Sequence, residues 1–268
     1  MDYAPSVSSR PPAGTPVTWG PRDVFWGILI GLGVLVLTFA AVAAPFAAAF
    51  GADSAAANAA AALSQALFEV LTVAAIVMLV RRSGGDLASL GWRRPVPPAE
   101  RAGFEPGGPA GPAQPEFPWA YTAGVIAAGL VACFVALYVY LAIVSVLGID
   151  VLEPGRQIPE DYFSNPIVVA MLGLGVVVAA PVCEETFFRG FVFGGLRASL
   201  GFWPAAFVSG FFFSMAHFQL GLVVPFGVIG IILAWVYNRS SSLVPNMGIH
   251  FLFNLMQFLV LVLVPGAR

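Results

Sequence analysis

The sequence predicts an all-α fold, a polytopic membrane bundle of about seven transmembrane helices, and two observations carry this prediction. Hydrophobic residues make up 59% of the 268-residue chain and charged residues only 10%. Soluble domains carry about 25% charged residues, so lipid must solvate much of this surface. The apolar residues also gather in runs of about 20, the length at which a helix crosses a hydrocarbon layer of about 30 Å.

The order of these runs divides the chain into five segments. They are a polar tail (1–23), two N-terminal spans (24–80), a linker rich in Arg, Pro and Gly (81–118), a third span with an acidic loop (119–165), and a core of four spans (166–264). We expect the tail to be disordered, because it has too little apolar surface to bury. Within the core, spans are expected to begin near 166 and to cover about 203–218, 222–237 and 245–264.

The linker sets the expected direction of insertion. It contains Arg81, Arg82, Arg93, Arg94 and Arg101, and loops rich in arginine stay in the cytoplasm. The N-terminus is then cytoplasmic and the acidic loop lies outside. The absence of lysine beside abundant Ala, Gly and Pro is typical of a high-GC bacterial genome, so we expect a multi-pass protein of a bacterial plasma membrane. A net charge of -2 argues against nucleic-acid binding.

Ionisable side chains are costly inside a bilayer, so each one in a predicted span indicates a functional site. The role of Glu69 is left open by the sequence. The other side chains in the predicted spans that can act as acids, bases or hydrogen-bond donors in a reaction all follow residue 180: Glu184, Glu185, Arg189, His217, His250 and Asn254. On a helix, Glu185 and Arg189 stand four residues apart and can form an ion pair. Glu184 is rotated by about 100° from Glu185, which leaves it free for general-base work. The alternative is a structural ion pair in which both acids only hold helices together.

The two histidines can reach this pair from other spans. A hairpin turning at about Leu200 and Gly201 places Glu184 and His217 at one depth. His250 follows Pro245 closely and is nominally shallower, so its approach requires helix tilt or a membrane-embedded loop. Asn254 lies one turn deeper on the face of His250 and could hydrogen-bond an oxyanion.

Other local signals predict packing. Cys133 and Cys183 lie in apolar runs, which argues against a disulfide or a cysteine zinc site. The chain has neither HExxH nor GxSxG. Gly190 and Gly194 have the GxxxG spacing of closely packed helices.

Together, these motifs resemble those of the CAAX protease and bacteriocin-processing family (CPBP, also called Abi), which includes the type II CAAX prenyl proteases. The matching residues are Glu184, Glu185 and Arg189 as EExxxR, Phe213 and His217 as FxxxH, and His250 and Asn254 as HxxxN, within about 166–258. The resemblance implies an intramembrane endopeptidase whose conical cavity opens toward the cytoplasm. Glu184 would activate water with help from His217, and His250 with Asn254 would stabilise the oxyanion. Glu185 and Arg189 would hold the helix, and Phe188 and Phe213 would contact substrate.

The resemblance leaves the cofactor open. Glu184, His217 and His250 form a His₂Glu set of the kind that catalytic zinc accepts, but glutamate-activated water without a metal is equally compatible with the motifs. The implied partners are the lipid bilayer and a membrane-embedded or lipid-associated peptide or protein. The sequence does not identify that substrate.

Two other classes of function compete with a peptidase. The first is a non-catalytic immunity or binding protein of the same fold, against which the intact polar set argues. The second is a proton or cation transporter, because intramembrane Glu and His also build proton relays. The paired halves with broken helices that are typical of transporters are not visible in the sequence.

Overall fold

The computed structural model describes residues 17–52, 54–97, 117–155, 158, 162–163 and 165–264. Within them, six helical runs are long and apolar enough to cross a membrane. These runs are Pro21–Phe50, Ala55–Arg82 (α3), Trp119–Leu147 (α5), Pro166–Leu200, Leu220–Ser240 (α10) and Val244–Leu263 (α11). A shorter apolar helix, α9, spans Phe202–Met215, and a 3-10 turn, η2, spans Asp150–Leu152. The chain is therefore a multi-pass integral membrane protein with an all-α fold, as predicted.

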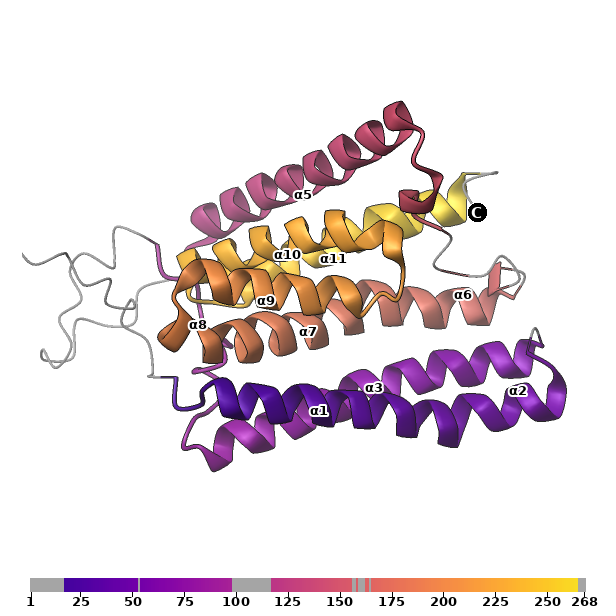
Figure 1. Cartoon of the computed structure of the whole chain (residues 1–268), viewed down its shortest axis with the longest axis horizontal. Coiled ribbons are helices and arrows are strands. Elements are labelled where there is room, and N and C mark those ends of the chain that lie inside the picture. Colours follow the sequence, from indigo (N-terminus) through magenta and orange to yellow (C-terminus); the bar gives the residue numbers. More distant parts are fainter. Residues whose placement is uncertain are drawn as a thin grey trace, which may run out of the picture.

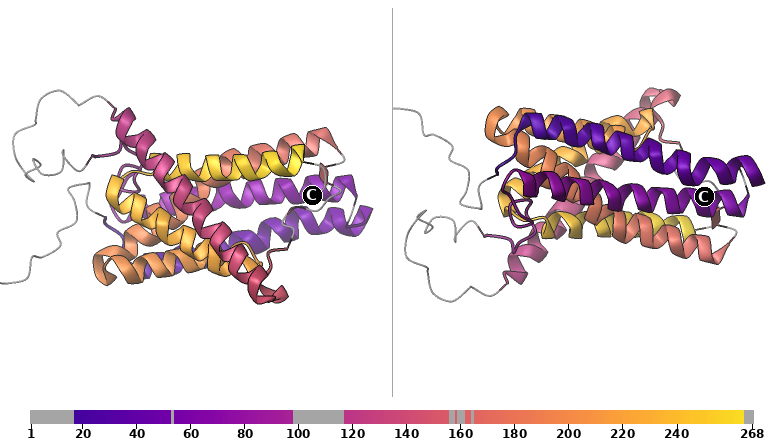
Figure 2. Two further views of the ribbon diagram at one scale, coloured as in Figure 1. Left: turned by 90° about the horizontal axis from the view of Figure 1, so that it is seen from above. Right: turned by 90° about the horizontal axis from the view of Figure 1, so that it is seen from below.

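Apart from α5, the helices run close to one common axis, and the run from α6 to α8 lies between the N-terminal helices and the pair α9 and α10 (Figure 1). The N-terminal hairpin packs α3 against the long run Pro166–Leu200. On the other side, α9 packs against α10, and α5 crosses α10 and α11 obliquely (Figure 2). In the most apolar window of α5, only 17% of the residues are buried inside the protein, so most of this helix must face lipid.

Two of the long runs contain π-helical stretches. The first consists of α1 (Pro21–Thr38), η1 (Phe39–Ala43) and α2 (Ala44–Phe50). The other consists of α6 (Pro166–Gly173), η4 (Leu174–Ala179), α7 (Ala180–Glu184), η5 (Glu185–Phe193) and α8 (Gly194–Leu200). A π turn closes its hydrogen bond over five residues, and such turns often occur at functional sites. Here η5 begins directly at the second glutamate of EExxxR.

The turn predicted between the fourth and fifth spans is confirmed. Gly201 separates α8 from α9 with φ of 77°, a conformation that glycine adopts without strain. The predicted fifth span was too long, because α9 ends at Met215 instead of about 218. Residues 216–219 form a turn in which Phe218 has a positive φ of 53°.

The start of the chain differs from the expectation of a disordered tail through residue 23. Residues 1–16 lie outside the described residues, but α1 begins at Pro21 and Trp19 is only 3% exposed. The Trp19 indole N–H donates to the carbonyl of Phe191 at 2.9 Å, and the two rings stack. A buried Trp with a satisfied N–H is well suited to anchoring a segment. Residues 17–23 are therefore part of the fold.

Residues 86–97, which we call the strap, close one end of the bundle. Leu90 in the strap is fully buried, and its carbonyl accepts a hydrogen bond from the hydroxyl of Tyr237. The Gly91 carbonyl accepts from the amide of Leu243 at 2.8 Å. A Cβ at Gly190 would lie 2.7 Å from the Leu90 carbonyl oxygen, so this glycine permits close packing against the strap, whereas the GxxxG spacing predicted close packing against another helix. The remainder of the predicted linker, 98–116, lies outside the described residues.

Candidate active site

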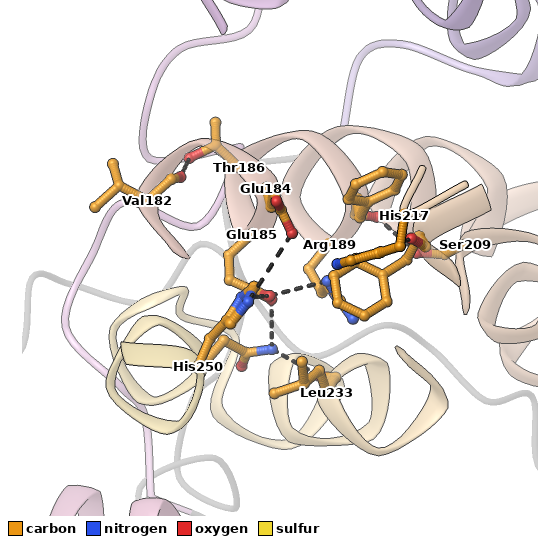
Figure 3. A network of polar contacts seen from close by, with 12 residues as sticks. Val182, Glu184, Glu185, Thr186, Arg189, Ser209, His217, Leu233 and His250 are labelled. Atoms are coloured by element: carbon orange, nitrogen blue, oxygen red, sulfur yellow. Dashed lines mark hydrogen bonds and ion pairs between the residues drawn. The ribbon is translucent and has the colours of Figure 1, made fainter. Parts of the chain in front are cut away.

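The two adjacent glutamates occupy different environments. The side chain of Glu185 is fully buried, whereas that of Glu184 is 22% exposed. They diverge because successive helical residues are rotated by about 100°. Glu185 faces the interior of the bundle and Glu184 faces a cavity (Figure 3). The burial of the two side chains therefore agrees with the prediction that Glu185 is held in place and Glu184 is left free.

Glu185 is held by three partners. Its Oε1 accepts a hydrogen bond from Nη1 of Arg189 at 2.9 Å, which confirms the predicted ion pair. The same oxygen accepts from Nδ1 of His250 at 2.9 Å, and Oε2 accepts from Nδ2 of Asn246 at 3.3 Å. A buried carboxylate with this many donors stays charged and fixed in position.

His250 links the two glutamates. Because the Glu185 carboxylate can only accept, Nδ1 of His250 must carry the hydrogen of that contact. Its Nε2 then faces Oε2 of Glu184 at 3.9 Å, too far for a direct hydrogen bond. Oε2 of Glu184 is buried and has no hydrogen-bond partner. A gap of this size between two polar atoms fits a bridging water molecule.

His217 follows the end of α9 and lines the same cavity as Glu184. Its Nδ1 donates to the carbonyl of Phe213 at 2.9 Å, and its ring meets Phe226 edge to face at 4.5 Å between centroids. These contacts fix the ring and leave Nε2 as the nitrogen available for chemistry. The structure therefore brings both histidines and Glu184 to one cavity. The hairpin register predicts this for Glu184 and His217 but not for His250.

Asn254 also lines this cavity, one turn beyond His250 on α11. Its Nδ2 donates to the carbonyl of Val176 in η4 at 2.8 Å. An amide nitrogen carries two hydrogens, so this contact orients the side chain and leaves a second donor on the same atom.

The two phenylalanines of the motifs differ from each other. Phe213 lines the cavity, and its ring lies 4.2 Å from the guanidinium carbon of Arg189, a cation–π contact that helps to hold the buried charge. Phe188 is buried and meets Phe213 edge to face, but it does not line the cavity. Phe188 therefore supports the ring of Phe213 from behind the cavity wall, and its direct contact with substrate stays a prediction.

The cavity has a volume of about 520 Å³ and lies among α3, the run from α6 to α7, α10 and α11. Its polar lining residues are Gln65, Glu69, Glu184, His217, Gln219, His250, Asn254 and Gln257. Apolar side chains make up most of the remaining wall. A volume of this size admits a short peptide segment.

Three residues with roles at this site were missed in the sequence. Asn246 is fully buried, and its Nδ2 donates to Glu185 and to the carbonyl of Leu233. Asn246 lies four residues before His250, as Asn254 lies four residues after it, so the same four-residue spacing could have indicated Asn246 as a site residue. Ser209 donates to the carbonyl of Phe188 across the α8–α9 hairpin, for which the sequence offers no signal. Gln65 donates to Glu69 at 2.9 Å and gives Glu69 its partner.

The described residues contain no group of three or more His, Cys, Asp or Glu side chains close enough to hold a metal ion. Glu184, His217 and His250 share the cavity but do not form a ready coordination site. The residues do not fit the expectation of a zinc set, and no step below passes through a metal.

Comparison with known proteins identifies one family. Residues 166–256 match the family model described as type II CAAX prenyl endopeptidase Rce1-like. No curated protein and no solved structure matches the chain. The matched segment contains all of the motif residues that converge on the cavity.

Proposed function

We propose that this chain is an intramembrane peptidase that uses Glu184 to activate water, because residues 166–256 match the model of the Rce1-like type II CAAX prenyl endopeptidases. The family match supports an endopeptidase, and the geometry of the site favours glutamate-activated water. One observation carries this assignment. The unpartnered Oε2 of Glu184 faces Nε2 of His250 across 3.9 Å, at the inner end of a cavity.

Glu184 is the general base of the proposed reaction. A water bridging its Oε2 and Nε2 of His250 gives up a proton to the carboxylate as it attacks the peptide carbonyl carbon. The apolar wall limits bulk water and strengthens this electrostatic interaction. Protonated Glu184 then donates to the departing amine, which completes the proton transfer without a second acid.

His250 and Glu185 act as a pair. In the resting state Nε2 of His250 accepts from the water, because Nδ1 carries the ring hydrogen. To donate to an oxyanion, Nε2 must first take up a proton from solvent water that enters the cavity, and the Glu185 carboxylate at Nδ1 stabilises the resulting imidazolium. Serine proteases use a buried aspartate for the same purpose. Asn246 and Arg189 in turn hold Glu185.

His217 and Asn254 complete the site from opposite walls. Nε2 of His217 is available to orient the water, because Nδ1 is committed to the carbonyl of Phe213. The second amide hydrogen of Asn254 can donate to the developing oxyanion. Removal of a single such donor commonly lowers kcat by about 10²- to 10³-fold. We propose a membrane-associated peptide segment as the substrate class.

The test is the Glu184→Gln variant, which keeps the shape of the side chain and removes the base. Peptide termini in membranes from cells that make this variant are compared with wild type by mass spectrometry. We expect wild-type termini to fall by about 10²- to 10⁴-fold, the usual contribution of a general base. The matched control is Glu153→Gln, the same substitution at an exposed residue beyond α5. Peptide termini that do not change in Glu184→Gln at equal expression would refute the mechanism and favour the non-catalytic binding protein.

A further inference from the structure

Helix α3 supplies one wall of the cavity, although it lies outside the segment that matches the family model. Four of its lining residues follow the i, i+3, i+4, i+7 spacing of a single helix face: Ala62, Gln65, Ala66 and Glu69. The helix packs against α7, which ends at Glu184. Two helices that are far apart in the sequence therefore present a carboxyl group each to the same cavity.

Glu69 is a buried acid that the mechanism above does not use. The residue is 5% exposed, and its Oε1 accepts a hydrogen bond from Nε2 of Gln65 at 2.9 Å. Its Oε2 is buried and has no hydrogen-bond partner among the described residues. The titratable groups that interact with it electrostatically are Glu184 and Cys183 on α7 and His250 on α11. One oxygen is thus held in place, and the other is left for exchange of a proton with water in the cavity.

The surroundings of Glu69 favour its neutral form at rest. A charge in an apolar site is costly unless donors or an opposite charge compensate it. Glu69 has one amide donor, whereas Glu185 has an arginine, a histidine and an amide. His250 accepts at Nε2 in the resting state and offers no positive charge. The carboxylate of Glu184 adds repulsion, and two carboxyl groups that share a site commonly hold one proton between them. Oε2 of Glu69 then carries the hydrogen, because Oε1 accepts from Gln65.

We propose that Glu69 stores the proton that Nε2 of His250 takes up, and that it delivers this proton through water in the cavity. The O–H bond of Glu69 breaks as the N–H bond on His250 forms, and the proton returns by the same route when the oxyanion collapses. Glu184 meanwhile takes a proton from the attacking water, so the cavity never holds two charged carboxylates. No proton is gained or lost over the cycle. This inference rests on the proposed peptidase function and deepens it.

Infrared spectroscopy of the purified protein at neutral pH tests the protonation of Glu69 without measuring proteolysis. Glu69→Gln keeps the shape of the side chain and an acceptor for Gln65, but it cannot store the proton. We expect a protonated-carboxyl band in wild type that shifts in heavy water and is absent from Glu69→Gln. The matched control is Thr72→Val, because Thr72 lies about one turn further along α3, is also 5% exposed and does not line the cavity. This variant should keep the band. If Glu69→Gln removes no such band, the inference is overturned.

Counting of peptide termini in membranes that contain equal amounts of each variant tests the role of the stored proton. If Glu69 only held α3 in place, Glu69→Gln would cleave normally, because glutamine still accepts from Gln65. We instead expect its termini to fall by about 10²-fold, the lower end of the range for general acid–base catalysis, and those of Thr72→Val to stay at the wild-type level. Normal termini in Glu69→Gln beside their loss in Glu184→Gln would overturn the inference and leave the peptidase mechanism standing. Normal termini in Glu184→Gln would refute that mechanism, and the inference with it.

Discussion

The Glu185–Arg189 pair permits a test that separates stability from catalysis. Arg189→Met removes the positive charge and leaves the Glu185 carboxylate fully buried with only the donors of His250 and Asn246. Removing one partner of a buried ion pair costs about 3–5 kcal/mol. We expect the free energy of unfolding in detergent, measured by denaturant titration, to fall by that amount.

The double variant Glu185→Leu/Arg189→Met removes both charges. Replacement of a buried ion pair by apolar side chains of similar volume is often close to neutral for stability. We therefore expect the double variant to recover most of the lost free energy of unfolding. Proteolysis should not recover, because Nδ1 of His250 loses its acceptor and the ring loses its orientation. The expected deficit is about 10²- to 10⁴-fold, the range for a misoriented general acid–base group.

The assays are denaturation of the purified protein and counting of peptide termini in membranes that contain equal amounts of each variant. A double variant that is stable and also fully active would refute the positioning role of Glu185. Unchanged stability of Arg189→Met would show that the buried charge is compensated in another way. The first result would return the pair to the alternative reading, in which both acids serve only helix packing.

Two further predictions concern the strap end. Gly190→Ala should destabilise the protein by about 1–3 kcal/mol, the usual cost of overpacking, because its Cβ would lie 2.7 Å from a backbone carbonyl oxygen of the strap. Gly33→Ala, with nothing within 4 Å of the added Cβ, is the matched control in thermal unfolding and should be neutral or stabilising. Hydrogen bonds from the backbone and side chain of Ser89 lower the pKa of Asp86 below its ordinary value of 3.8. Because the folded-state pKa is the lower one, the stabilisation is complete above about pH 4 and is lost as pH falls through the folded-state value. Wild type should therefore exceed Asp86→Asn in Tm at neutral pH, and the two should converge in acid; a constant Tm difference across this range would contradict the argument.

The sequence predicted the parts of the site that depend on spacing along one helix. The Glu185–Arg189 pair follows from four-residue spacing, and the Gly201 turn follows from the end of an apolar run. The shared cavity of Glu184 and His217 follows from counting residues back from that turn. In each case, local geometry limits the outcome to one arrangement.

The parts that were not predicted depend on contacts between distant segments. His250 meets Glu185 because of how α11 packs against α7 and η5, and no spacing rule in the chain specifies that contact. Trp19 looked like part of a polar tail because its partner, Phe191, is 172 positions away. The short length of α9 depends on a turn at residues 216–219 that interrupts an apolar run without any Pro or Gly.

The π-helical stretch η5 makes the number of residues in this helix as consequential as their identity. A π turn contains about one residue more than an α turn, so it is equivalent to a local insertion. A gain or loss of one residue that this π turn does not absorb would rotate everything beyond it by about 100°. The rotation would carry the Gly201 turn with it and move His217 out of line with Glu184. The site should therefore tolerate changes of side chain on the lipid-facing surface much better than it tolerates a gain or loss of a single residue in this helix.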